Sequence, residues 1–565
     1  MTKNLLSPIG YGRFLIAIAG IGGLLYGIDL GIIAAALLYL SKTVSLTVEQ
    51  TSMIVAAVLG GSMCSSLVAG VLADWVGRKK LMMVSGLLFV GSVALIVMSQ
   101  NFVPLFCGRL LQGASGGVIA VVVPLYLAET LSASSRGKGT AVFQFMLTVG
   151  IVIAALTGWF YTRQAEAAIS AAACNLTLIR AAQNHAWRGM FLSVIYPGII
   201  FFLGSWVLSE TPRWLIRQGR PDEALSALRR SMSEHDAQVA IREIEALALD
   251  RINQASTGAS GSLMQKKYVL PFVLACTVLA FNQATGINSV LGFLVIILKQ
   301  AGMSDNHATA GDVAVKVLNC LVTIAAIALV DRKGRTFLLK LGTAGIIFAL
   351  VSVALLFHGF ESQRVNVADK LQAALSGNTL AFPVNETTLG PASGGRPMAL
   401  TVLYSQDSGD KVVTVLSSDK DAVIRISPDN KGASMPITIK RALYGPVPTE
   451  RTGWLITGCL GVFVGAYSLG PGVVVWLMLS ELMPTRIRSI GMGIALLLNS
   501  GVSTLIAAVF LPVVGNHGYA AMFLLWAMCT VIYFITAAFL LPETKGKTLE
   551  EIEMYFGKRD PKVLA

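Results

Sequence analysis

Charged residues are scarce in this chain of 565 residues, because Asp, Glu, Lys and Arg together make up 13% of it, about half of the ~25% typical of soluble domains. Hydrophobic residues account for 54%, and the 55 glycines add about another tenth. A soluble globule of this length needs far more charge to cover its surface, so that class is excluded. Disorder is excluded for the same reason. Despite the net charge of +13, we expect no nucleic-acid partner.

Closely spaced cysteines are also lacking. No two cysteines are near enough to form a C-x-x-C pair, and most lie inside apolar runs. The seven are Cys64, Cys107, Cys174, Cys276, Cys320, Cys459 and Cys529. The pattern predicts no disulfide framework and no metal site. We also expect no cofactor and no enzymatic activity.

Long apolar runs are what the chain has in place of charge. A helix needs ~20 apolar residues to cross the ~30 Å hydrocarbon core of a bilayer. We count twelve such runs, six before a charged stretch and six after it. They cover about 13–40, 51–73, 80–99, 103–128, 139–161, 189–208, 268–299, 311–330, 337–357, 453–480, 487–512 and 519–541. The sequence therefore predicts an all-α membrane protein with twelve transmembrane helices.

Lys and Arg gather in alternate loops between these runs. Arg78, Arg136, Arg335 and Arg486 lie in loops on one side, whereas the third-to-fourth and eleventh-to-twelfth loops contain no Lys or Arg. Because positive residues favour the cytoplasmic side, we expect both termini in the cytoplasm. The expected location is a plasma membrane, a bacterial inner membrane being the first choice, with membrane lipids as partners.

Three segments fall outside the apolar runs. Residues 209–267 carry charges among Ala and Leu at helical spacing, which predicts short amphipathic cytoplasmic helices. Residues 162–188 are interpreted as an enlarged external loop. Residues 358–452 form a polar external insertion, in which Lys411–Leu416 and Ala422–Ile426 flank a turn-like Asp419-Lys420-Asp421. This pattern predicts a β-hairpin, with a disordered loop as the alternative, and the insertion's own partner is unknown.

The chain also repeats itself at consistent offsets. The repeats are Asp74-Trp75-Val76-Gly77-Arg78 with Asp331-Arg332-Lys333-Gly334-Arg335, 257 residues later, Glu129 with Glu481, 352 later, and Glu210 with Glu543, 333 later. The 95 residues by which the second offset exceeds the first equal the length of 358–452, and the third offset is 19 shorter than the second, in the direction that an enlarged 162–188 segment requires. Two duplicated six-helix halves with a site between them are the architecture of major facilitator transporters. The predicted division is 1–208, first half; 209–267, linker; 268–357 and 453–541, second half; 358–452, β-rich insertion; and 542–565, cytoplasmic tail.

The repeated charges predict a cytoplasmic gate. Glycine permits a tight turn between helices, and arginine pairs with carboxylates through its two-pronged guanidinium. Ion pairs that form in one conformation and break in another make a two-state gate, whereas simple anchoring of the helices at the membrane surface is the alternative. The gate residues are Asp74, Gly77, Arg78, Glu129, Arg136, Glu210, Arg213, Asp331, Gly334, Arg335, Glu481, Arg486 and Glu543.

These motifs, taken in order, resemble the sugar porter family of the major facilitator superfamily, and bacterial proton-linked monosaccharide symporters in particular. The resemblance covers nearly all of the chain except 358–452 and most of 162–188. Besides the repeated motifs it rests on Arg136-Gly137-Lys138, Glu210-Thr211-Pro212-Arg213-Trp214-Leu215, Gln283-Ala284-Thr285-Gly286-Ile287-Asn288, Gly470-Pro471-Gly472 and Pro542-Glu543-Thr544-Lys545-Gly546. It implies a transporter that moves a small sugar by alternating access.

Isolated polar residues within the apolar runs are candidates for a sugar site, because a polar group in a span is costly and amides both donate and accept hydrogen bonds. The resemblance implies sugar binding by Gln144, Gln283, Asn288, Asn319, Trp476 and Asn499. We add Asn282, Tyr26 and Phe293 to this set. Gln283 and Asn288 are five residues apart and need a broken helix to converge, which Gly286 would provide. Ordinary hydrogen bonding between helices is the alternative for each residue.

Asp29 in the first span decides the question of coupling. An isolated carboxylate there is expensive unless it is paired, and Arg109 in the fourth span is the nearest plausible partner. The resemblance implies that proton-linked members carry an acid and an arginine at these two positions. The residues therefore favour a sugar–proton symporter, with protons as partners. The alternatives are a passive facilitator, in which the pair never titrates, and, less favoured, a sugar sensor or a drug–proton antiporter.

Overall fold

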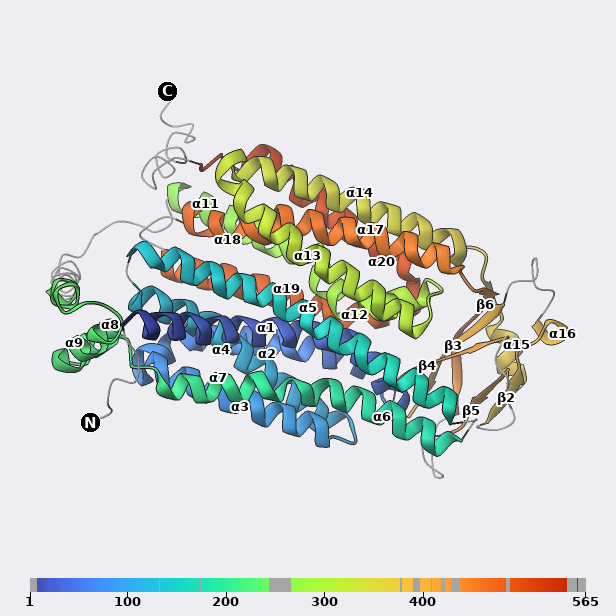
Figure 1. Cartoon of the computed structure of the whole chain (residues 1–565). Helices are drawn as coiled ribbons and strands as arrows, with labels where there is room; N and C mark the ends of the chain where they lie inside the picture. Colours follow the sequence, from blue (N-terminus) through green and yellow to red (C-terminus); the bar gives the residue numbers. More distant parts are fainter. Residues whose placement is uncertain are drawn as a thin grey trace, which may run out of the picture.

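The chain folds into a bundle of long helices with small β-sheets at one end, in a computed structural model (Figure 1). The structure describes residues 8–131, 133–172, 175–242, 266–375, 379–389, 397–407, 409–417, 422–428, 436–483, 488–545 and 556. We call the end with the β-sheets the sheet end, and the opposite end, where α8 and α9 lie, the linker end. Helix α1 begins at the linker end.

Two groups of helices make up the bundle. The N bundle consists of α1 (Pro8–Thr43), α2 (Val48–Val76), α3 (Arg78–Met98), α4 (Phe102–Thr130), α5 (Ala133–Ala171), α6 (Leu176–Ser193) and α7 (Ile195–Val207). The C bundle consists of α11 (Lys266–Ala284), α12 (Ile287–Gln300), α13 (Asp305–Lys333), α14 (Arg335–Glu361), α17 (Glu450–Leu469), α18 (Pro471–Leu482), α19 (Arg488–His517), α20 (Tyr519–Ile535) and the π-helical turn η2 (Thr536–Leu540). The two bundles meet along α2 and α19, α5 and α13, and α1 and α12.

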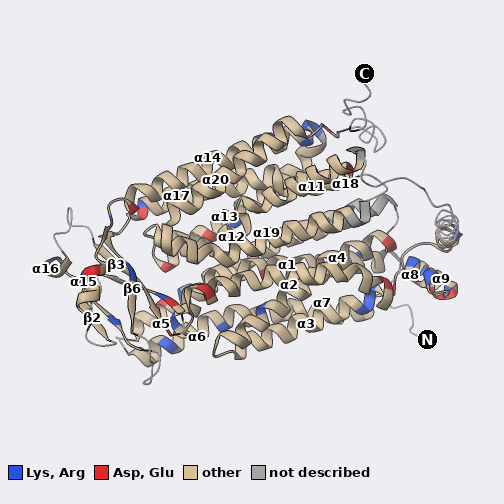
Figure 2. Cartoon of the chain, turned by 180° about the vertical axis from the view of Figure 1, so that it is seen from behind, with Lys and Arg blue, Asp and Glu red and all other residues tan. Residues whose placement is uncertain are grey.

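The described residues contain 12 helical stretches that are long and apolar enough to cross a membrane. The prediction of twelve spans is therefore confirmed. Figure 2 shows the charged residues gathered toward the two ends of the helices, with few along their middle. This distribution is the one expected when the middle of each helix faces hydrocarbon.

The prediction of an enlarged loop over 162–188 is wrong. Helix α5 continues to Ala171, and α6 begins at Leu176 and runs on into α7. The segment is rich in alanine, the strongest helix former, and Asn175 caps α6 by accepting hydrogen bonds from the amides of Thr177 and Leu178 at 3.1 and 3.4 Å. The extra residues of the first half thus lengthen two helices instead of a loop.

The insertion between α14 and α17 contains two antiparallel sheets. Its elements are β1 (Val365–Asn366), α15 (Ala368–Ala373), β2 (Leu380–Pro383), α16 (Glu386–Leu389), β3 (Met398–Gln406), β4 (Gly409–Leu416), β5 (Val423–Ile426) and β6 (Thr438–Pro446). The larger sheet has the order β1-β6-β3-β4, and the smaller pairs β2 with β5. Leu400, Val402 and Ile424 are fully buried between these elements.

The two predicted strands exist as β4 and β5, but the predicted hairpin between them is wrong. Strand β4 pairs with β3 from Ala399–Leu416 to Gln406–Gly409, and β5 pairs with β2. The longer β3 offers β4 eight partners across a tight connection, whereas β5 is four residues long. Gly409 has φ +117°, a conformation that glycine adopts at little cost.

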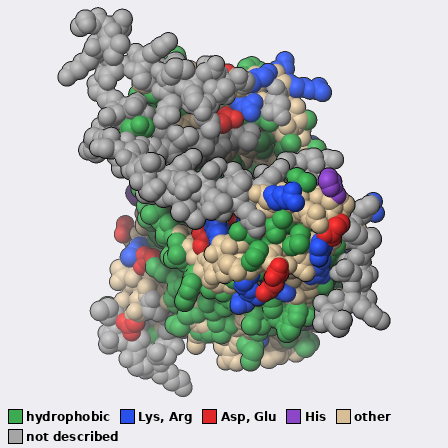
Figure 3. Space-filling view, turned by 90° about the vertical axis from the view of Figure 1, so that its left-hand side faces the viewer, with side chains coloured by type: hydrophobic (Ala, Val, Ile, Leu, Met, Phe, Trp, Pro, Cys, Tyr) green, Lys and Arg blue, Asp and Glu red, His purple; other side chains and the backbone are tan. Residues whose placement is uncertain are grey.

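The link between the bundles begins with α8 (Pro212–Arg217) and α9 (Pro221–Arg229), followed by a helix over 234–242. The described part of the predicted linker is thus helical, whereas Glu243 and Glu245, which belong to the same charged pattern of 209–267, lie outside the described residues. Figure 3 views the linker end and shows basic and acidic side chains lying next to one another among hydrophobic ones.

Candidate transport site and its gate

Asp29 lies in a helix that is drawn tightly against α5. A side chain at Gly23, Gly27 or Gly31 would collide with the backbone or side chains of α5, the closest approach being 1.9 Å from Gly27 to the carbonyl oxygen of Leu147. Small residues that let helices approach closely are typical of packing in membranes. This packing fixes α1 and directs Asp29 toward α4.

The structure brings Asp29 and Arg109 together, as the sequence predicts. Arg109 Nη1 lies 3.1 Å from Asp29 Oδ1, and the side chains of Arg109 and Asp29 are 1% and 0% exposed. The same guanidinium donates to Gln112 Oε1 at 2.6 Å, and its carbon lies 5.5 Å from the centre of the Phe191 ring. Asp29 Oδ2 is buried without a hydrogen-bond partner. A carboxylate in this position has an oxygen at which a proton can be held.

A break in the seventh span brings Gln283 and Asn288 together. Helix α11 ends at Ala284 and α12 begins at Ile287, and Gly286 between them has φ +81°. Across this break Asn288 Nδ2 donates to Gln283 Oε1 at 2.9 Å and to Ser503 Oγ of α19 at 2.8 Å. The predicted convergence is therefore observed, and Gly286 provides it.

Three further predicted amides lie in the C bundle. Asn282 Nδ2 donates to the Tyr467 hydroxyl at 3.2 Å, and Asn319 Oδ1 accepts a hydrogen bond from Ser468 at 2.5 Å. Asn499 is 6% exposed, and its Oδ1 is buried without a partner. Amides with unused hydrogen-bonding capacity are able to receive the hydroxyl groups of a ligand.

The structure does not join the remaining predicted residues to these amides. Gln144 lies half-buried on α5, and Tyr26 on α1 lies against α4 at Gly116. Trp476 on α18 is 45% exposed. Phe293 is fully buried and stacks on Phe510 with 4.6 Å between ring centres, which is a packing contact of the core.

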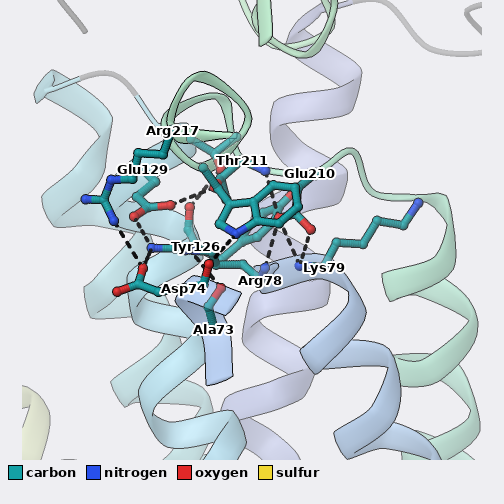
Figure 4. A network of polar contacts seen from close by, with 11 residues as sticks. Ala73, Asp74, Arg78, Lys79, Tyr126, Glu129, Glu210, Thr211 and Arg217 are labelled. Carbon is teal, nitrogen blue, oxygen red and sulfur yellow. Dashed lines mark hydrogen bonds and ion pairs between the residues drawn. The ribbon is translucent and has the colours of Figure 1, made fainter. Parts of the chain in front are cut away.

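The first set of gate residues forms one network at the linker end of the N bundle (Figure 4). Arg78 Nη2 lies 2.6 Å from Asp74 Oδ1 and 2.9 Å from Glu129 Oε1, and Thr211 donates to Glu129 Oε2 at 2.6 Å. Glu210 Oε1 accepts the backbone amides of residues 78 and 79 at 3.0 and 3.1 Å. The network thus connects α2, α3, α4 and the start of α8.

The turn at Gly77 permits this arrangement. Gly77 has φ +102°, and a Cβ there would lie 2.4 Å from Glu210 Oε2. Burial raises the pKa of Glu210 and outweighs the opposing effect of the backbone amides that it accepts.

The C bundle contains the same network at the equivalent positions. The amides of Arg335 and Thr336 donate to the two carboxylate oxygens of Glu543 at 3.0 Å each. Arg335 Nη2 lies 3.4 Å from Glu481 Oε1, and Thr544 donates to Glu481 Oε2 at 2.5 Å. The sequence repeats therefore correspond to repeated contacts. Each contact joins elements of a single bundle, so the networks tie each bundle together.

The two networks differ in their exposure. Arg78 and Glu129 have side chains 2% and 5% exposed, whereas Arg335 and Glu481 are 14% and 23% exposed. Burial raises the pKa of Glu543 too, but the backbone amides of Lys545, Arg335 and Thr336 outweigh it, so the pKa is lowered overall.

Four charged gate residues remain from the sequence prediction. The side chains of Arg136, Asp331 and Arg486 lie outside the described residues, and Arg213 lies in α8 beside the first network.

Several polar residues of the structure gave little or no signal in the sequence. Gln112 follows Arg109 by one helical turn, and its isolation in an apolar run was the available signal. Ser468 and Ser503 carried no signal, because serine is common in membrane helices. Asp312 and Lys316 form an ion pair of 2.8 Å inside α13 with side chains 1% and 0% exposed. Both charges lie in the first two turns of the span predicted over 311–330, close to the membrane surface, where charged residues are common and give little signal.

The sequence profile of the family described as Sugar (and other) transporter matches residues 15–376 and 438–556. The chain belongs to this family. It is a transporter of a sugar or another metabolite and not an enzyme. The unmatched residues between the two ranges lie within the insertion that carries the sheets.

Individual relatives agree with this family. The glucose transporter GlcP of Staphylococcus epidermidis is 26% identical over 97% of this chain and 98% of its own. The proton myo-inositol cotransporter hmit-1.1 of Caenorhabditis elegans is 28% identical over 97% of this chain and 90% of its own. Among solved structures, the xylose transporter XylE from E. coli in an inward-open conformation has a TM-score of 0.66 at 21% identity, over 96% of this chain and 98% of its own. The predicted major facilitator fold is thereby confirmed.

Proposed function

We propose that this transporter imports a monosaccharide by alternating access and couples the import to proton entry through Asp29 and Arg109. The observation that carries the proposal is the fully buried pair, in which one carboxylate oxygen bonds Arg109 and the other has no partner. Protonation of Asp29 removes its charge and weakens its bond to Arg109. A change of this kind shifts an equilibrium between two conformations when it favours one of them.

The polar residues of the C bundle support a sugar as the substrate. Gln283, Asn288, Asn319 and Asn499 lie on α11, α12, α13 and α19. Amides on several helices suit a ring that carries hydroxyl groups on all sides. The names of the glucose and myo-inositol transporters among the relatives agree with such a substrate. We assign Gln144, Asn282, Trp476 and Tyr26 to the same site as secondary residues, whereas Phe293 supports the core beside it by stacking on Phe510.

The two networks at the linker end support motion of each bundle as a unit. Because their contacts join helices of one bundle, they hold each bundle rigid while the bundles rock against one another. We assign the linker end to the cytoplasm, which follows from the Lys and Arg of its loops. With this orientation, the insertion with its sheets faces the outside. We assign the protein to a plasma membrane.

A passive facilitator is the second candidate. The observation that favours it is the burial of both Asp29 and Arg109. A strong buried ion pair can stay ionised throughout the transport cycle. In that case sugar equilibrates across the membrane and Asp29 only supports the fold.

Uptake into liposomes distinguishes the two candidates. The protein is reconstituted, and hexoses, pentoses and polyols are offered with and without an inward proton gradient. One proton driven by 100 mV supplies ~2.3 kcal/mol and one pH unit adds ~1.4 kcal/mol, which together permit accumulation of about 500-fold. Symport predicts accumulation that is lost in Asp29→Asn, while exchange of sugar across the membrane persists.

The matched control is Glu223→Gln, the same kind of change in an exposed ion pair of α9 with Arg220, and it leaves accumulation intact. Equilibration without accumulation, unchanged in Asp29→Asn, would establish the facilitator. If none of the compounds is transported, the substrate is not a sugar of these classes.

A further inference from the structure

The eighth span contains a pair of charges that neither the proton pair nor the sugar residues use. Asp312 and Lys316 lie one turn apart on α13, with 2.8 Å between Lys316 Nζ and Asp312 Oδ2. Both side chains are buried, and α13 begins at Asp305, so the pair lies two to three turns inside the helix. Charges at such a depth are costly and are candidates for function.

Lys316 also reaches across to the other bundle. Its ammonium donates to the carbonyl oxygen of Gly31 on α1 at 3.0 Å. A helical carbonyl oxygen has a second lone pair for such a bond. Gly31 follows Asp29 by two residues. The bond therefore joins the C bundle to the N bundle beside the proposed proton site.

This bond is one of several polar contacts between described residues that join α13 to the N bundle, and one turn deeper the Thr148 hydroxyl of α5 lies 3.5 Å from the Cys320 thiol. At the rim Lys42 Nζ lies 3.4 Å from Asp305 Oδ2, and Trp159 Nε1 donates to Asn306 Oδ1 at 3.1 Å. Lys42 has a side chain 40% exposed, whereas that of Lys316 is 0% exposed. Solvent weakens an exposed ion pair, so the buried bond contributes most.

The two charges have different tasks in this arrangement. Asp312 neutralises Lys316 within the same helix. The ammonium can therefore stay buried whether or not it contacts the N bundle. Asp312 Oδ1 has no partner and is buried. If the bundles separate at the sheet end, Lys316 keeps Asp312 and loses Gly31. The bond to Gly31 thus forms only when the sheet end is closed.

We propose that Asp312 and Lys316 form a latch that holds the two bundles together at the sheet end, with Lys316 making the bond between them and Asp312 positioning it. The proposal rests on alternating access as proposed above, but not on the identity of the sugar or on the proton. Opening toward the sheet side requires the bond between Lys316 and Gly31 to break.

The test measures the separation of the bundles directly. Spin labels are attached at cysteines introduced at the exposed residues Ser170 of α5 and Arg451 of α17, with the native cysteines replaced by serine. Pulsed electron resonance then gives the distance distribution, without sugar and without a proton gradient. The variant Asp312→Leu with Lys316→Met removes both charges together, because removing one alone would leave an unpaired buried charge.

The expected result is a rise of about tenfold in the ratio of separated to closed molecules, which is the effect of losing one charged hydrogen bond of about 1.4 kcal/mol. The control Lys42→Met breaks the rim pair between the same two helices, and it changes the ratio less than about twofold. An unchanged ratio in the double variant, or an equal change in the control, would overturn the latch.

Two provisions keep the test decisive. If the double variant does not fold, Asp312→Asn with Lys316→Gln removes the charges with less change of polarity and shape, and a rise in the ratio is again expected. If no sugar is transported by the native protein, the proposed substrate is wrong, but the distance measurement still decides the latch because it uses no substrate.

Discussion

Gln283 and Asn288 share a hydrogen bond of 2.9 Å although they are five positions apart in sequence. In a continuous helix, side chains at this spacing diverge around the axis, because neighbours on one face lie three or four residues apart. The contact exists because Gly286 turns the chain through φ +81° between α11 and α12. The break in the seventh span thus depends on Gly286.

Gly286→Ala tests this dependence. A Cβ at Gly286 would lie 2.3 Å from the Trp526 ring, and the conformation is also strained for any residue with a side chain. We expect a loss of about 3 kcal/mol or more in stability, from overpacking together with backbone strain, and loss of transport. The thermal midpoint in detergent and uptake into liposomes measure these effects.

The matched control for this change is Gly219→Ala. Gly219 has φ +71°, but a Cβ there meets nothing within 4 Å. Only the strain of about 1–2 kcal/mol is then expected, with transport retained. Equal losses of stability and transport in Gly286→Ala and Gly219→Ala would show that the close contact with Trp526 does not contribute to the effect.

Substitution of Asn499 is expected to weaken sugar binding alone, whereas substitution of Asn319 is expected to lower stability as well. Asn499 Oδ1 is buried without a partner, whereas Asn319 Oδ1 accepts a hydrogen bond from Ser468 at 2.5 Å. Asn499→Ala therefore removes an amide that is free for the sugar. We expect the KM for uptake to rise about tenfold, the effect of about 1.4 kcal/mol, with little change in thermal midpoint.

Asn319→Ala is the comparison, because it leaves Ser468 without its partner and lowers the stability by about 1–2 kcal/mol as well as raising KM. A thermal midpoint that falls in Asn499→Ala as far as in Asn319→Ala would contradict the assignment of Asn499 to the substrate.

The sequence was sufficient for the features that depend on local chemistry. The spans follow from apolar length, the break at Gly286 from one glycine between two amides, and the pair of Asp29 with Arg109 from two isolated charges. The repeat offsets also predicted which residues form equivalent networks, because Arg78 and Arg335 lie in identical turns.

Other features depended on partners distant in sequence. The strand β4 was recognised, but its pairing with β3 depends on residues 398–406, which were not identified as a strand. The bond from Lys316 to Gly31 joins residues 285 apart and ends on a backbone carbonyl, which no side-chain pattern indicates. Alanine-rich residues of 162–188 have a strong helical preference that their polar neighbours obscured.

Arg78 and Arg335 provide a prediction from the difference between the two networks. Arg78→Ala leaves Glu129 buried without its ion pair, and removing one partner of such a pair costs about 3–5 kcal/mol. Arg335→Ala acts on a longer, partly exposed pair, so we expect about 1–2 kcal/mol. Thermal unfolding in detergent measures both. A loss as large in Arg335→Ala as in Arg78→Ala would show that exposure does not control the strength of these networks.

Arg78→Lys tests the geometry of the same network. The guanidinium of Arg78 bonds Asp74 and Glu129 through Nη2 and the carbonyl oxygen of Ala73 through Nη1 at 3.0 Å. Lysine keeps the charge but has no planar fork, so it recovers only part of the stability that alanine loses. Full recovery would mean that the charge alone is required.

Glu210 and Glu543 are predicted to respond to pH in opposite directions. The pKa of Glu543 is lowered in the folded protein, because backbone amides stabilise its charged form beyond the cost of burial. Its stabilising contribution is therefore present above the unfolded pKa of about 4.3 and is lost as pH falls through the lower folded pKa. The pKa of Glu210 is raised by burial, so its charged form is disfavoured by folding, and stability falls as pH rises through the raised pKa.

The glutamine variants of these two residues test that contrast, because each is fixed in a neutral form. At pH 7, Glu543→Gln lowers the thermal midpoint, and its difference from the native protein shrinks as the pH falls from the unfolded pKa of about 4.3 through the lower folded pKa. For Glu210→Gln, the thermal midpoint of the variant rises relative to that of the native protein as pH rises from about 4 to about 7. Midpoints measured in detergent from about pH 3 to about pH 7 give both slopes. Slopes of the same sign would contradict the opposite effects of burial and backbone amides at these two equivalent carboxylates.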